Sequence, residues 1–272
     1  MMLINKDAIL NWEIFNYPWE HQIVDNFLNE TIFEKIRLSC KLLLDKENIR
    51  KYPLLVKKLK QASFGSWDLS QEFHIYDLIN SGIPEKIVEL IYDCSQEFLY
   101  LLPQLHQKYS NPRKFNSYHV VPKLNMDFPG LPRDIHDESE RKSISVVLYL
   151  DPDENESTSL HIDNSEESIV KIPEWKPNRA LIFCGEVGKT WHSYQVIGKK
   201  PRFVLVIFVE NFQSDIPLFT YKFSNGKIAT LPDENFNQIG ISYKTQMEKN
   251  FNTPYIKNSG YLYPTFKLST DP

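Results

Sequence analysis

The run SISVVLYL at residues 143–150 carries apolar side chains on both faces of an extended chain, and so does RFVLVIFV at residues 202–209. Successive residues of a strand point to opposite faces, so a strand that is apolar throughout is covered on both sides. The two runs therefore predict central strands of a sheet that packs against a second sheet on one face and against helices on the other.

Further short runs rich in β-branched residues surround these two, and polar or proline-containing turns separate them. This pattern of short strands and turns begins after about Pro112 and is typical of an antiparallel, mainly β core. We predict strands at residues 115–124, 143–150, 157–162, 169–172, 179–184, 190–195 and 202–208.

The first part of the chain has helical rather than strand-like spacing. Apolar side chains recur every three or four residues at 25–46 and 84–105, and a further helix is expected at 51–61. Asn29 or Thr31 is expected to cap the first of these helices. We interpret the helices as a support for the β core.

Composition limits the classes of function. The chain has 272 residues, of which 42% are hydrophobic, and its net charge is −4. We expect one domain, with helical support at 1–112, the β core at 113–212 and an extension at 213–272 that forms a wrap, a lid or a partly ordered tail. The chain has no excess of basic residues that would attract nucleic acid or an anionic membrane surface. Three widely spaced cysteines and an N-terminus without signal-peptide features favour a cytoplasmic protein.

Three features of the β region have the residue types for one reactive site. His136, Asp137 and Glu138 follow the loop DFPGLPRD, and His192 lies in KTWHSYQV. Two histidines and one carboxylate match the ligand set of non-haem Fe(II) sites, which leave positions open for other ligands. Arg202 begins RFVLVIFV, where a guanidinium can bind a carboxylate through two parallel hydrogen bonds.

Tyr118 to Asn211 resembles the superfamily of 2-oxoglutarate and Fe(II)-dependent dioxygenases, in particular its prolyl-hydroxylase-like branch and small bacterial and phage oxygenases. The segments that carry the resemblance occur in the family's order: IHDE, SVVLYLDPDEN, STSLHI, KPNRALIF, TWHSY and IGKKPRF. The resemblance implies a double-stranded β-helix, the jelly-roll fold that cupins share. It also implies Fe(II), O2 and the cosubstrate 2-oxoglutarate.

By this resemblance His136, Glu138 and His192 bind the metal, and Arg202 binds the distal carboxylate of 2-oxoglutarate. Asp137 remains an alternative carboxylate, but Glu138 is favoured because residues 136 and 138 of a strand share a face. Asn125, Tyr118 and Ser145 are expected to touch the cosubstrate. His161 is expected to line the pocket or face solvent rather than bind metal.

The predicted activity is hydroxylation of a small molecule, such as an amino acid or a biosynthetic intermediate, with release of succinate and CO2. A carboxylate at the ligand position favours hydroxylation over halogenation. The alternatives are a peptide or protein hydroxylase of the same superfamily, a cupin-like sugar-binding or isomerase module, and a partner-binding protein that uses the aromatic C-terminal segment. The sequence leaves the substrate and the oligomeric state open.

Overall fold

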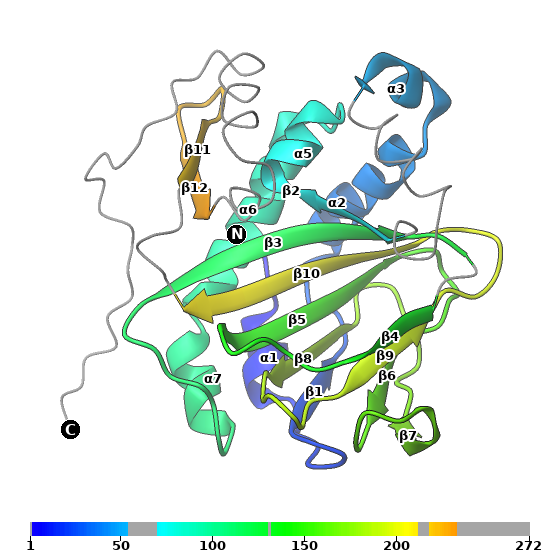
Figure 1. The fold of residues 1–272 in the computed structure, drawn as a ribbon. Helices are drawn as coiled ribbons and strands as arrows, with labels where there is room; N and C mark the ends of the chain where they lie inside the picture. Colours follow the sequence, from blue (N-terminus) through cyan, green and yellow to red (C-terminus); the bar gives the residue numbers. More distant parts are fainter. Residues whose placement is uncertain (1, 54–69, 130–131, 212–217, 233–272) are drawn as a thin grey trace.

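The computed structural model describes residues 2–53, 70–129, 132–211 and 218–232 (Figure 1). Its helices are α1 (Lys6–Asn11), α2 (Glu30–Leu43), α3 (Lys46–Lys51), α5 (Ile75–Asn80), α6 (Glu85–Leu99), α7 (Leu102–Lys108) and the short 3-10 helix η1 (Glu166–Ser168). Its strands are β1 (His21–Val24), β2 (Ser70–His74), β3 (Tyr118–Asp127), β4 (Pro132–His136), β5 (Lys142–Asp151), β6 (Thr158–His161), β7 (Ile169–Lys171), β8 (Ala180–Cys184), β9 (His192–Gln195), β10 (Arg202–Asn211), β11 (Leu218–Lys222) and β12 (Ile228–Pro232). No helix in these ranges is both long and apolar enough to cross a membrane.

The β core consists of two antiparallel sheets. The larger has the order β1-β8-β5-β10-β3-β2, and the smaller has the order β4-β9-β6-β7. From β3 to β10 the chain passes back and forth between the sheets, because β3, β5, β8 and β10 belong to the larger one and the strands between them to the smaller. This alternation is the jelly-roll topology that the sequence predicts.

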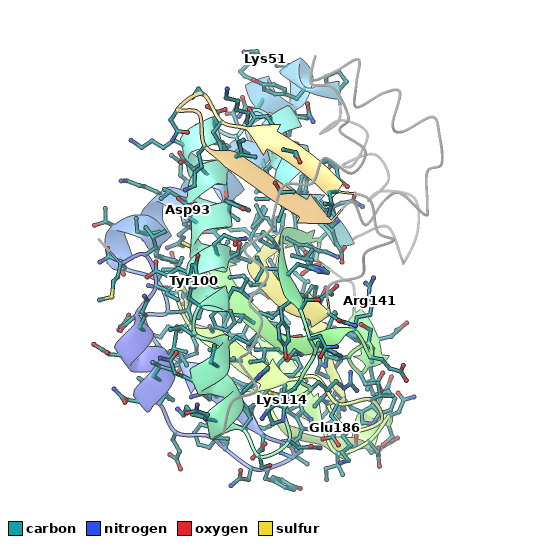
Figure 2. All side chains as sticks on the ribbon, turned by 90° about the vertical axis from the view of Figure 1, so that its left-hand side faces the viewer. Lys51, Asp93, Tyr100, Lys114, Arg141 and Glu186 are labelled. Atoms are coloured by element: carbon teal, nitrogen blue, oxygen red, sulfur yellow. The ribbon has the colours of Figure 1, made fainter. Side chains whose placement is uncertain are left out.

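The helices cover one face of the larger sheet, and the smaller sheet lies against the other (Figure 1). On β10, Leu205 and Ile207 join the helical core, whereas Val204 and Val206 face the inside of the jelly roll. Figure 2 shows this layering from the side, with α6 and the labelled Asp93 and Tyr100 on the helical side and Arg141 towards the opposite one. The two apolar runs at 143–150 and 202–209 are therefore central strands covered on both faces, as predicted.

The helices differ from the predicted ranges at their ends. Asn29 caps α2 by accepting a hydrogen bond from the backbone N–H of Thr31 at 3.1 Å. The helix expected at 84–105 is broken into α6 and α7, because Pro103 lacks the N–H that a continuous helix would need there. The helix expected at 51–61 falls mostly outside the described residues.

Three strands and one hairpin were not predicted. β1 and β2 are edge strands of the larger sheet, and β4 is an edge strand of the smaller sheet that begins at Pro132. Proline is tolerated in an edge strand, but its presence in the sequence favours the prediction of a loop. In the segment expected as a wrap, lid or tail, β11 and β12 form a hairpin. Its tip packs on α6, where Ser224 binds Glu85.

A buried histidine joins the N-terminal segment to the small sheet. His21 on β1 is fully buried; its Nδ1 lies 2.8 Å from the carbonyl oxygen of Trp19, and its Nε2 lies 3.1 Å from Nζ of Lys171 on β7. The Lys171 ammonium also lies 3.6 Å from the ring centroid of Phe15. Burial, with a smaller effect from Lys171, lowers the pKa of His21 to about 4.

This lowered pKa makes folding stability depend on pH. Between pH 6.5 and about 4 the unfolded chain binds a proton at His21 that the folded chain does not, so stability is complete above pH 6.5 and falls as the pH decreases. We expect His21 alone to account for a loss of about 2–3 kcal/mol over this range. Urea unfolding at pH 7.5 and pH 4.5 measures it. His21→Gln should show a smaller difference, whereas parallel pH curves for the two proteins would contradict the assignment.

Candidate functional site

The candidate site lies inside the jelly roll, between the two sheets. On the larger sheet, Ser145 of β5 is paired with Phe183 of β8 on one side and with Phe208 of β10 on the other. On the smaller sheet, His192 of β9 is paired with Leu160 of β6, which packs against Phe183. His192 therefore faces the larger sheet, and its ring centroid lies 5.2 Å from that of Phe183.

Strand pairing brings the two predicted histidines together. His136 at the end of β4 is the register partner of His192, and their ring centroids are 4.2 Å apart with 51° between the ring planes. In each ring Nδ1 lies 2.8 Å from a backbone carbonyl oxygen, that of Asp134 for His136 and that of Thr190 for His192. An Nδ1–H that donates to a carbonyl places the lone pair on Nε2, so both rings are held in a metal-binding tautomer.

Glu138 is the buried carboxylate next to this pair. Its oxygens accept hydrogen bonds of 2.6 Å from the Ser145 hydroxyl and from Nζ of Lys142. Burial alone would raise the pKa of Glu138, but the charge of Lys142 and the hydrogen bonds from Lys142 and Ser145 together hold it below its ordinary value. Glu138 is therefore held in its ionised form, which is the form that binds a metal.

Asp137 is directed elsewhere. Its Oδ2 accepts a hydrogen bond of 2.5 Å from the backbone N–H of Gly188 in the loop between β8 and β9. Asp137 is partly exposed in the segment after β4, whereas Glu138 is buried, so the two carboxylates lie in different surroundings. The geometry thus favours Glu138 over Asp137 as a ligand.

His136, His192 and Glu138 are suitable ligands for a divalent metal, although their side chains do not form a complete metal site in this structure. Among the described residues, no three His, Cys, Asp or Glu side chains stand close enough to form a complete metal site. Glu138 is instead engaged with Lys142 and Ser145, and Nζ of Lys142 also lies 3.5 Å from the ring centroid of Phe208. Two imidazole nitrogens and one carboxylate are nevertheless the donors that suit Fe(II).

Arg202 lies at the start of β10 in the larger sheet, across the jelly roll from Tyr194 of β9. Its side chain is 1% exposed, and its Nη1 forms an ion pair of 2.9 Å with Asp127, which is equally buried. The guanidinium carbon lies 4.1 Å from the ring centroid of Tyr194 and 5.5 Å from that of Trp175. Aromatic rings and the ion pair together fix the orientation of the guanidinium.

Several hydrogen-bond donors around Arg202 are buried and unused. Within the described part of the chain, Nη2 of Arg202, Oγ1 of Thr158 and Nδ2 of Asn155 have no hydrogen-bond partner. Thr158 is the register partner of Tyr194, and Nε of Arg202 donates to the carbonyl of Glu156, the neighbour of Asn155. Buried donors are almost always satisfied in native proteins, so a cluster of unsatisfied ones indicates a place for an oxygen-rich ligand.

The remaining predicted residues are divided between the two faces of the larger sheet. Ser145 lies at the site through its bond to Glu138, and Asn125 on the inner face of β3 has a buried Oδ1 without a partner in the described residues. Tyr118 belongs to the helical core, and its hydroxyl accepts a hydrogen bond from the backbone N–H of Phe115. The structure does not bring Tyr118 to the site. His161 also points away, with Nε2 2.8 Å from the Ser193 hydroxyl.

Three residues of the site were not singled out in the sequence: Lys142, Thr158 and Asp127. Asp127 is two residues after Asn125, and this spacing alone places both on one face of a strand. Lys142 is four residues after Glu138, but the chain turns between them, so their contact depends on tertiary structure.

Gly185 supports the position of Glu138. A Cβ atom at residue 185 would lie 2.8 Å from Cβ of Glu138, closer than such atoms approach in real structures. We expect Gly185→Ala to displace Glu138 and to destabilise the fold by about 1–3 kcal/mol. Urea unfolding measures the second effect, and Mn(II) affinity, by electron paramagnetic resonance, measures the first. Wild-type stability together with wild-type affinity would contradict this role of Gly185.

Known proteins with a similar fold are found among solved structures. A prolyl-4-hydroxylase from Pseudomonas putida is similar over 71% of this chain and 92% of its own, with 13% identity and a TM-score of 0.45. A rice dioxygenase for auxin oxidation is similar over 82% and 85%, with 10% identity and a TM-score of 0.49. A viral collagen prolyl hydroxylase from Paramecium Bursaria Chlorella virus-1, solved as a 2OG complex, is similar over 71% and 96%, with 16% identity and a TM-score of 0.40.

The identities lie between 10% and 16%, and all three TM-scores are below 0.5. No family model matches the chain, and no curated protein matches it.

Proposed function

We propose that this protein is an Fe(II)- and 2-oxoglutarate-dependent dioxygenase that hydroxylates a small molecule, with conversion of 2-oxoglutarate and O2 to succinate and CO2. The observation that carries the proposal is the combination of two features inside the jelly roll, one on each sheet. These are the adjacent rings of His136 and His192 and the buried Arg202, whose Nη2 has no hydrogen-bond partner in the described residues.

Each residue has a distinct role in this proposal. His136 and His192 hold the metal through Nε2, and Glu138 supplies the carboxylate while Ser145 keeps it oriented. The Nη2 of Arg202 donates to the distal carboxylate of 2-oxoglutarate. Bound Fe(II) supplies the oxidising chemistry, for which the 2-oxo acid provides two electrons.

Apolar inner-face side chains separate the two ends of the site from water. Val204 and Val206 are buried against Tyr149 and Trp175 at the Arg202 end, and Phe183 is fully buried beside His192. Exclusion of water strengthens the hydrogen bonds to the cosubstrate and limits unproductive side reactions. These walls are therefore expected to protect the reaction.

The burial of the reactive groups favours a small substrate. His192 is 6% exposed and Glu138 is 3% exposed, whereas His136 is partly exposed, so two of the three groups are buried rather than placed along an open groove. An extended peptide would need such a groove. A comparison of O2 consumption with amino acids and with short peptides tests this part of the proposal.

Anaerobic titration with Fe(II) and then 2-oxoglutarate tests the function itself. Chelation of iron by the 2-oxo acid gives a weak visible charge-transfer band, and we expect this band at one equivalent of each component. Iron that binds without producing a band on addition of 2-oxoglutarate would overturn the proposed cosubstrate. Failure to bind iron would overturn the proposed enzyme class and favour a cupin-like binding module.

A further inference from the structure

Asp127 is the feature of the site that the proposed function does not use. Its carboxylate is 1% exposed, and it accepts hydrogen bonds of 2.9 Å from Nη1 of Arg202 and from the hydroxyl of Tyr194. Arg202 and Asp127 are direct register partners on β10 and β3, so the pairing is built into the sheet. The positive charge of Arg202 is thus balanced before any ligand arrives.

A guanidinium that already forms an ion pair with a carboxylate binds a further anion less strongly than an unpaired guanidinium does. A ligand carboxylate at Nη2 gains one hydrogen bond from Arg202 but also experiences the negative charge of Asp127 on the same guanidinium. At such short range, in a buried site, that repulsion offsets much of the attraction. The two-point clamp of a free guanidinium is unavailable here, because Nη1 is committed to Asp127 and Nε donates to the carbonyl of Glu156.

The other unused groups around Arg202 are neutral. The donors are Oγ1 of Thr158 and Nδ2 of Asn155, and Asn125 on the strand that carries Asp127 offers a buried acceptor oxygen. Such a set hydrogen-bonds a polar end group whether or not that group is charged. We infer that Asp127 is a specificity-determining residue, which makes this subsite charge-balanced so that it accepts 2-oxo acids with a distal carboxamide nearly as well as 2-oxoglutarate.

The inference rests on the proposed function, and its test uses ligands that differ only at the distal end. Calorimetry on Mn(II)-loaded wild-type protein compares 2-oxoglutarate, its 5-carboxamide and 2-oxovalerate, which lacks a polar end. We expect the first two to bind within about tenfold of each other, and 2-oxovalerate to bind more weakly than both. A preference of more than about a hundredfold for the carboxylate would overturn the inference and leave the proposed function intact.

Asp127→Asn provides the second arm. Removal of the balancing charge should tighten 2-oxoglutarate binding by at least about tenfold while the affinity for the carboxamide changes little. An unchanged or weaker affinity for 2-oxoglutarate would overturn the inference, since Asp127 would then only position Arg202. Asp25→Asn, which removes an Asp–Arg pair with Arg179 outside the barrel, controls for general destabilisation.

The two levels of failure are distinguishable. If neither wild type nor Asp127→Asn binds any of the three 2-oxo acids, the proposed function fails, and the inference fails with it. If Asp127→Asn does not fold, the comparison of ligands on the wild-type protein still decides the question.

Discussion

Replacement of His192 by alanine is expected to abolish turnover and to weaken Fe(II) or Mn(II) binding by more than about a hundredfold, since loss of a residue that only orients a ligand already costs up to that much. His192 is buried at 6% exposure, with Nδ1 held by the carbonyl of Thr190 and its ring against His136. Alanine removes one of the two imidazole ligands. A water molecule cannot take the place of this nitrogen in the same geometry. Metal affinity by competition with a chelator is the measurement.

His161→Ala is the matched control for this variant. His161 is equally buried on the neighbouring strand β6, but it points away from the site and bonds to Ser193. Its replacement should cost stability without changing metal affinity. Equal losses of metal binding in the two variants would show that general destabilisation is responsible, and would remove His192 from the ligand set.

Replacement of Arg202 by methionine is expected to have two separable effects. Loss of the Nη2 donor should weaken 2-oxoglutarate binding by about ten- to a hundredfold, because hydrogen bonds to charged groups contribute about 1.5–3 kcal/mol. The variant also leaves Asp127 buried without its counter-charge, which should reduce the free energy of unfolding by about 3–5 kcal/mol. Calorimetry with 2-oxoglutarate and urea unfolding measure the two effects.

A double variant separates stability from binding. Arg202→Met combined with Asp127→Leu replaces the whole ion pair with apolar side chains, which is often neutral for stability. Stability should recover in the double variant, whereas 2-oxoglutarate binding should not reach the wild-type level. Recovery of wild-type binding would contradict the role of Arg202 as the anchor.

The sequence predicts the central strands well because burial on both faces leaves a clear signal. The runs at 143–150 and 202–209 correspond to β5 and β10, which lie side by side in the larger sheet. Edge strands give a weaker signal, since they need not be apolar throughout. β4 carries His136 and yet begins at a proline, so local sequence alone describes it as a loop.

The candidate site is predictable only in part, for a related reason. Residue types and order point to His136, Glu138, His192 and Arg202; the structure pairs the two histidine rings and buries Glu138, His192 and Arg202. Strand register decides which side chains lie beside these four residues, and the periodicity of the sequence does not determine that register. Only the pairing of β3 with β10 makes Asp127 the neighbour of Arg202, and only the fold of the larger sheet places Tyr118 among the helices.

The alternation of the chain between two sheets links the site to folding of the entire core. His136 and His192 belong to the smaller sheet, while Ser145 and Arg202 belong to the larger one, so neither sheet alone contains the site. A partly folded chain in which the sheets have separated has nothing to which the metal and the 2-oxo acid can bind together. Ligand binding should therefore raise the midpoint of global unfolding by mass action, and it should slow hydrogen exchange in β5 and β9 alike.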